Sequence, residues 1–232
     1  MKILNPKQII VALDFDSIEE ANAIVKLLDP KIFRLKIGKQ LYASEGPKVL
    51  ENLNRKGFDI FLDLKLHDIP NTVYNALKNL LNNKIWMTNI HLLGGEEMIK
   101  AAIEAREHSK SEALLVGVTV LTSLDENNIK KMGFSFKIPE LVKILSMSAK
   151  KNKINGVVCS AKEVSDIKNN LGEDFITVTP GIRIQQNNND QSRVATLKEA
   201  KKNGSDFIVL GREITSSKNI AKMIKKVESY II

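Results

Sequence analysis

Apolar residues along the chain follow two alternating patterns. Short runs rich in valine, isoleucine and leucine are separated by longer stretches in which apolar residues recur at helical spacing. This alternation is typical of βα units that build a parallel sheet. The short runs predict eight strands, at residues 9–14, 32–37, 60–66, 87–93, 114–121, 156–160, 175–179 and 207–210.

A helix is predicted after each of these strands. Ser17, with Glu20 three residues later, is typical of a capping box that begins the first helix, and Gly57 ends the second. Eight strand–helix pairs within 232 residues favour a closed (β/α)₈ TIM barrel over an open sheet, and no linker divides residues 1–232, so a single domain is expected. The predicted helices cover residues 17–28, 47–55, 71–81, 96–108, 139–151, 161–171, 196–203 and 220–230.

Two connections in this pattern are long and irregular, at residues 122–138 and 183–193. The second is rich in asparagine and glutamine and follows the seventh strand, a position where TIM barrels often bind phosphate. We therefore expect a mobile functional loop there.

Composition narrows the location and the partners of the chain. With 43% hydrophobic and 27% charged residues it has the make-up of a globular protein. The N-terminal segment lacks the apolar core of a secretory signal, and no apolar run is long enough for a membrane span, so a cytoplasmic protein without a membrane partner is expected. The lone cysteine, Cys159, lies in an apolar run and is expected to be a small buried side chain.

A formal net charge of +8 fits either a nucleic-acid surface or recruitment of a small anionic substrate. The lysines are spread over the predicted helices, and no aromatic RNA-binding signature accompanies them. We therefore expect no nucleic-acid partner. The three histidines, His67, His91 and His108, are scattered, and no metal-binding or nucleotide-binding motif is present, so no metal site is expected.

Charged side chains gather at the ends of the first three predicted strands. Because side chains alternate along a strand, Asp63 and Lys65 share one face of the third strand, opposite its leucines. Lys36 lies in the same way on the second strand, and Asp14 ends the first. The leucine face should meet the helices, which leaves the charges inside the barrel near its C-terminal end, where barrel enzymes carry their active sites. A structural salt-bridge network is the alternative, although buried charges are costly to stability.

The charges of Lys36, Lys65, Asp63 and Asp68 sum to zero. Neighbouring carboxylates should keep both lysines protonated, which makes them poor Schiff-base nucleophiles and good proton donors. A substrate carboxylate about 4 Å from Asp63 would be repelled by about 4 kcal/mol at an effective dielectric of about 20. Loss of neutral CO₂ would remove that repulsion while a lysine protonated the carbanion, so the residues permit a decarboxylation.

Two glycine turns with arginines follow the seventh and eighth strands. One contains Gly181 and Arg183, and the other contains Gly211 and Arg212. Backbone N–H groups at such glycines and bidentate arginine contacts bind phosphate well. An ordinary surface loop is the less favoured alternative for either turn alone, and the two together on adjacent strands predict a phosphate-bearing substrate more specifically.

At these residues the chain resembles a known family. Residues 63–72 resemble the signature of the bacterial orotidine 5′-phosphate decarboxylases. Further similarity covers nearly the whole chain, in residues 11–14, 35–38, 118–123, 179–183, 190–191 and 211–212. The resemblance implies that the chain converts orotidine 5′-monophosphate to uridine 5′-monophosphate and CO₂, the last step of de novo synthesis of that nucleotide, without a metal or organic cofactor.

The resemblance also implies a role for individual residues. Lys65 would protonate C6 of the pyrimidine, Asp63 would oppose the substrate carboxylate, and Lys36 would complete the charge array. Asp68 and Thr72 would reach into the neighbouring site of a homodimer. The implied substrate contacts are Asp14 and Lys36 with the ribose hydroxyls, Thr122 and Ser123 near the ribose and base, and Arg183, Gln191, Gly211 and Arg212 with the phosphate.

One position departs from the family pattern. The family often has glycine immediately before the Asp190-Gln191 pair, and this chain has Asn189. Asparagine tolerates a left-handed backbone better than most residues. We expect closure of this loop to differ and the chemistry to be retained.

Two rival functions remain open. Related barrels that act on sugar phosphates, such as keto-gulonate-phosphate decarboxylases and hexulose-phosphate synthases, resemble the pattern at Asp63 and Lys65 but use magnesium, with a carboxylate at the second-strand position. Here that position holds Lys36, a cation that would repel the metal. A basic RNA-binding barrel is the other rival, and it would have no use for the negative charge of Asp63.

Overall fold

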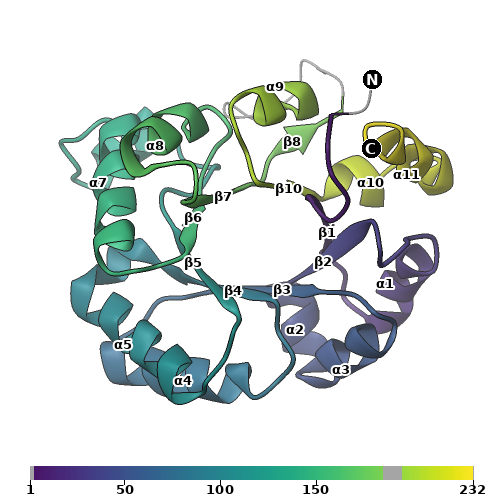
Figure 1. Ribbon diagram of the computed structural model, residues 1–232, viewed down its shortest axis with the longest axis horizontal. Coiled ribbons are helices and arrows are strands. Elements are labelled where there is room, and N and C mark those ends of the chain that lie inside the picture. The colour runs from purple at the N-terminus through teal and green to yellow at the C-terminus, as the bar shows by residue number, and fades with distance from the viewer. Residues whose placement is uncertain (1–2, 185–194, 232) are drawn as a thin grey trace.

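The computed structural model describes residues 3–184 and 195–231. Eight parallel strands close into a barrel in the order β1-β10-β7-β6-β5-β4-β3-β2, which confirms the predicted (β/α)₈ TIM barrel (Figure 1). These strands are β1 (Ile9–Leu13), β2 (Phe33–Gly38), β3 (Ile60–Leu66), β4 (Met87–His91), β5 (Leu114–Val118), β6 (Gly156–Val158), β7 (Ile176–Thr179) and β10 (Phe207–Leu210).

Helices surround the ring of strands on its outer side (Figure 1). Each predicted helix is present with its ends moved by a few residues: α1 (Ile18–Val25), α3 (Lys48–Arg55), α4 (Pro70–Leu81), α5 (Gly95–His108), α7 (Ile138–Lys151), α8 (Val164–Leu171), α9 (Leu197–Lys202) and α11 (Ile220–Glu228). At the start of α1 the Ser17 hydroxyl accepts a hydrogen bond from the Glu20 amide at 3.3 Å. This is one of the two hydrogen bonds of the predicted capping box, the one that the Ser17 side chain accepts.

Several short elements in the connections were not predicted. They are α2 (Lys39–Glu45), the 3₁₀ turn η1 (Leu92–Gly94), α6 (Glu126–Lys131), α10 (Arg212–Thr215), and the paired strands β8 (Ile182–Arg183) and β9 (Ala195–Thr196). Each spans seven residues or fewer, which is shorter than the window of about 11 to 18 residues over which a helical period is read, and the two strands are shorter than the roughly four residues that a strand pattern needs. β5 ends at Val118 and not at Leu121, because the apolar residues Val120 and Leu121 line a cavity and do not continue the strand.

Two apolar layers lie on either side of the barrel wall. Inward-facing side chains fill the barrel, among them Ile10, Phe61 and Val178. Outward-facing neighbours, such as Val11 and Leu62, are buried under the helices. The alternation predicted for β1 and β3 is therefore confirmed, and it assigns the charged residues of these strands to the barrel interior.

The side chain of Arg34 lies at the N-terminal end of the barrel. The guanidinium of Arg34 lies 3.8 Å from the centre of the Trp86 ring and 3.2 Å from a carboxylate oxygen of Asp59. Arg34 shares the inward face of β2 with Lys36 but belongs to the opposite end of the barrel. Cys159 is buried, as expected. Within residues 3–184 and 195–231, none of the helices is long and apolar enough to cross a bilayer.

Candidate active site

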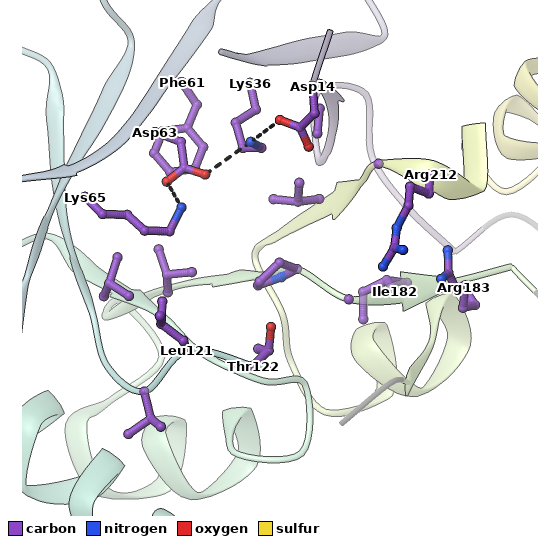
Figure 2. Close-up of a pocket in the computed structure, with 18 residues that line it drawn as sticks. Asp14, Lys36, Phe61, Asp63, Lys65, Leu121, Thr122, Ile182, Arg183 and Arg212 are labelled. Carbon is purple, nitrogen blue, oxygen red and sulfur yellow. Dashed lines mark hydrogen bonds and ion pairs between the residues drawn. The ribbon is translucent and has the colours of Figure 1, made fainter. Parts of the chain in front are cut away.

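A cavity of about 280 Å³ lies at the C-terminal ends of the barrel strands. Its walls come from residues of β1, β2, β3, β5, β6 and β10 and from the segments that follow β1, β5, β7 and β10 (Figure 2). Charged side chains occupy two sides of the cavity, and apolar side chains such as Phe61 and Val158 also line it. The sequence-predicted residues that line it are Asp14, Lys36, Asp63, Lys65, Thr122, Arg183, Gly211 and Arg212.

Four charged residues, in β2 and β3 and directly after β1, form a continuous chain of ion pairs. Lys36 Nζ lies 3.0 Å from Asp14 Oδ1 and 3.2 Å from Asp63 Oδ2. Lys65 Nζ lies 2.6 Å from Asp63 Oδ1. Figure 2 shows Lys36 between the two carboxylates and Lys65 extending toward Asp63 from the other side. The charges alternate along the cavity wall, and we call Asp14, Lys36, Asp63 and Lys65 the charge array.

Burial makes the two central charges of the array, Lys36 and Asp63, depend on their neighbours. The side chains of Lys36 and Asp63 are 11% and 9% exposed. Burial by itself would lower the pKa of Lys36, but the charges of Asp63 and Asp14 outweigh it and hold that pKa above its ordinary value. Burial would likewise raise the pKa of Asp63, but Lys36 and Lys65 hold it below its ordinary value. Lys36 is therefore a fixed cation and Asp63 a fixed anion at neutral pH.

The backbone of β3 is irregular where it carries the array. Its pairing with β4 shifts register between Leu62 and Leu66, and Lys65 has a φ of 50°. The buried side chain of Asn89, on β4, accepts a hydrogen bond from the Lys65 amide and donates one to Asp63, each at 2.7 Å. Sequence reasoning missed Asn89. The available signal was an asparagine inside a strand, a place where this residue is uncommon.

Arginines lie at the other side of the cavity. Arg183 and Arg212 enter from the β7 and β10 sides, next to Gly181 and Gly211 (Figure 2). Arg183 Nη1 lies 3.6 Å from Glu213 Oε2, and Glu213 Oε1 accepts a hydrogen bond from the Ile184 amide at 3.1 Å. Glu213 thus contacts both the side chain of Arg183 and the backbone amide of the following residue. Sequence reasoning did not assign this role to Glu213. Together the arginines offer a cationic site for a phosphate group.

Three sequence-predicted residues among those described are not brought to the cavity of their own chain. Asp68 and Thr72 are exposed, in the β3–α4 connection and the first turn of α4, and Ser123 is exposed after β5. Asp68 Oδ1 accepts a hydrogen bond from the Ile69 amide at 2.7 Å. Gln191, like Asn189, lies outside the described residues.

A pair of histidines lies beside the array. The rings of His67 and His91 stack with centroids 5.2 Å apart. Burial, followed by the nearby His67, Lys65 and Lys39, lowers the pKa of His91 to about 4, so His91 is neutral at neutral pH. Within the described part of the chain, no three His, Cys, Asp or Glu side chains are grouped so as to hold a metal ion.

The family model, the curated relatives and the solved structures that match this chain include the same kind of enzyme. The model of the "Orotidine 5′-phosphate decarboxylase / HUMPS family" matches residues 7–227. An orotidine 5′-phosphate decarboxylase of Saccharophagus degradans is 46% identical over 98% of this chain and 95% of its own length. One from Teredinibacter turnerae is 45% identical over 95% of each. The crystal structure of orotidine 5′-phosphate decarboxylase from Lactobacillus acidophilus superposes with a TM-score of 0.84 at 37% identity, covering 97% of this chain and 98% of that one.

Proposed function

The chain belongs to the orotidine 5′-phosphate decarboxylase / HUMPS family and decarboxylates orotidine 5′-monophosphate to uridine 5′-monophosphate in pyrimidine biosynthesis, and we propose that it does so by electrostatic destabilisation of the substrate carboxylate. The observation that carries the mechanism is the unbroken Lys36–Asp63–Lys65 ion-pair chain on the wall of the cavity. A fixed anion there faces the place where a bound carboxylate would lie.

The two charged sides of the cavity suit the two anionic groups of the substrate. The 5′-phosphate binds beside Arg183, Arg212 and the Gly211 amide, with Gln191 as a further expected contact. The ribose hydroxyls lie against Asp14 and Lys36, and Thr122 lies near the ribose and base. Ser123, which is exposed outside the cavity, is a further contact expected from the family resemblance. The pyrimidine then places its carboxylate beside Asp63 and its C6 beside Lys65. Phosphate binding supplies the free energy that holds the carboxylate against the repulsion of Asp63.

The chemical step follows from this placement. At about 4 Å and an effective dielectric of about 20, the two carboxylates repel each other by about 4 kcal/mol. When the bond between C6 and the carboxyl carbon breaks, neutral CO₂ leaves and the electron pair stays on C6. The ammonium of Lys65 stabilises this carbanion and then donates a proton to C6. Lys65 regains its proton from solvent, and no metal or organic cofactor takes part.

The magnesium-dependent relatives are distinguished from this mechanism by the second-strand position. Lys36 Nζ contacts carboxylates of both Asp14 and Asp63, so a cation already occupies the place between them. Activity that survives a chelator supports the proposal. The RNA-binding alternative finds no support at the cavity, because an exposed row of cations suits a nucleic-acid strand and a buried alternating row does not.

We also propose a cytoplasmic homodimer of single-domain subunits, residues 1–232, in which Asp68 and Thr72 complete the neighbouring site. Both residues are exposed and lie outside the cavity of their own chain, although they directly follow the strand that carries Asp63 and Lys65. Ile69, which lies between them, is 66% exposed. An apolar side chain of this size on the rim of an active site suits burial against a second copy.

The experiment is an assay of absorbance loss with orotidine 5′-monophosphate. The wild-type protein turns the substrate over, and Lys65→Ala is nearly inactive while its circular dichroism and melting temperature stay close to wild type. Lys100→Ala is the matched control, because Lys100 forms exposed ion pairs with Glu96 and Glu97 on α5, outside the cavity. Full turnover by Lys65→Ala would overturn the proposed role of this lysine.

A further inference from the structure

Asn89 contacts two members of the charge array at once. It lies in the middle of β4 and is completely buried. Its Oδ1 accepts the Lys65 amide and its Nδ2 donates to Asp63 Oδ1, and both bonds are 2.7 Å long. Asn89 is not among the residues that line the cavity. Its carboxamide therefore reaches the residues that act on the substrate without reaching the substrate itself.

The backbone that Asn89 holds is strained. Among the described residues, the non-glycine residues with positive φ are Lys7, Lys65, Lys110 and Lys153, and of these Lys65 alone belongs to a strand, while the others lie in turns. A left-handed residue in a strand is uncommon and persists only where its surroundings hold it. The Lys65 amide cannot follow the regular ladder, because the pairing of β3 with β4 shifts register at this point. The Asn89 carbonyl oxygen takes the place of the missing ladder acceptor.

The same side chain fixes the carboxylate of Asp63. Oδ1 of that carboxylate accepts from Lys65 Nζ at 2.6 Å and from Asn89 Nδ2, while Oδ2 faces Lys36 Nζ at 3.2 Å. The contacts from Lys36 and Lys65 would not fix the carboxylate by themselves, because both lysine side chains are long and can move together with it. Asn89 is the contact from a rigid, buried strand, so it sets the plane in which Asp63 lies.

We propose that Asn89 is a positioning residue for the decarboxylation, which sets the left-handed turn at Lys65 and the orientation of the Asp63 carboxylate through one carboxamide. The inference rests on the charge-array mechanism proposed above. It predicts that loss of the carboxamide lowers the rate of the chemical step and leaves substrate binding nearly unchanged, because the cavity wall and the arginines stay in place.

The first test compares Asn89→Ala with Thr88→Val. Thr88 is the neighbouring residue on β4, is also buried, and donates a hydrogen bond to the Leu62 carbonyl at 3.1 Å on the other face of the strand. Each variant loses buried hydrogen bonding from the same strand. We expect kcat of Asn89→Ala to fall by about 100-fold with little change in KM, since misplacement of reacting groups by about 1 Å has this effect. Thr88→Val should keep a kcat near wild type.

The second test separates the two hydrogen bonds. Asn89→Asp retains an acceptor for the Lys65 amide but replaces the donor to Asp63 with a second carboxyl group. We expect its kcat to rise, relative to wild type, as the pH is lowered and the new carboxyl group becomes protonated and able to donate. This profile is the deciding measurement if Asn89→Ala does not fold.

Three outcomes would overturn the inference: wild-type kcat in Asn89→Ala, an equal loss of kcat in Thr88→Val, or a wild-type pH profile in Asn89→Asp. Lys65→Ala, assayed in parallel, distinguishes failure of the positioning role of Asn89 from failure of the charge-array mechanism. An inactive Lys65→Ala beside a fully active Asn89→Ala overturns the positioning role alone, whereas an active Lys65→Ala overturns the mechanism on which it rests.

Discussion

At the residue scale, the site depends on side chains whose protonation is set by their neighbours. The presence of Asp63, Lys65 and Lys36 on one inner wall could be predicted from strand alternation, because each residue lies on a face opposite to leucine or isoleucine. The left-handed backbone at Lys65 and its contact with Asn89 could not. Alternation assumes regular strands, and this irregularity arises from a contact with a second strand.

His91 gives a residue-scale prediction of pH dependence. Its pKa is lowered from 6.5 to about 4, so below pH 6.5 the unfolded chain binds a proton that the folded protein does not. Stability is therefore complete above pH 6.5 and decreases as the pH falls. Between pH 7 and pH 5 this group should remove about 2 kcal/mol from the free energy of unfolding.

The measurement is urea denaturation of wild type and of His91→Asn at pH 7 and pH 5. The variant should lose less stability over this interval, and the difference between the two proteins isolates the histidine from the carboxylates that both retain. An identical loss in both proteins would show that His91 is not held neutral by its surroundings.

At the element scale, the barrel requires close approach between particular strands. β6 and β7 pair at Gly156 and Ile176, and a Cβ at Gly156 would come within 2.1 Å of the Ile176 carbonyl oxygen. A Cβ at Gly117, on β5, would come within 2.4 Å of the flexible Leu92 side chain. Long elements were predictable from their periodicity. Short ones such as α2 and α10 were not, because seven and four residues contain too few apolar positions to establish a helical period.

Gly156→Ala should therefore destabilise the protein by roughly 3 kcal/mol, because backbone atoms of β7 must move to admit the methyl group. Gly117→Ala should cost only about 1 kcal/mol, because Leu92 can change rotamer. Thermal unfolding of both variants shows which substitution lowers the melting temperature more. Equal melting temperatures, or a more stable Gly156→Ala, would contradict the close approach of these two strands.

At the scale of the whole molecule, the closed barrel could be predicted because eight βα units repeat along the chain and the apolar faces of strands and helices are complementary. The assembly could not be derived from the same pattern. The proposed dimer rests on family resemblance and on the exposed positions of Asp68 and Thr72. One chain alone places neither residue at its own cavity.

Mixing of two inactive variants tests the dimer. Lys65→Ala and Asp68→Ala should each be nearly inactive alone. After joint unfolding and refolding, heterodimers should contain one site with both native residues, which restores about one quarter of wild-type activity for a two-fold symmetric dimer. If Asp68 served its own chain, every site in the mixture would lack one of the two residues and the activity would stay at the level of the single variants.

The most direct test of the mechanism is to remove the negative charge of Asp63 while keeping its shape. In Asp63→Asn, single-turnover decarboxylation should slow by about a thousandfold, the equivalent of about 4 kcal/mol of relieved repulsion. The affinity for orotidine 5′-monophosphate, relative to that for uridine 5′-monophosphate, should increase, because only the former brings a carboxylate to this position. A wild-type rate of decarboxylation, or an unchanged ratio of the two affinities, would contradict electrostatic destabilisation.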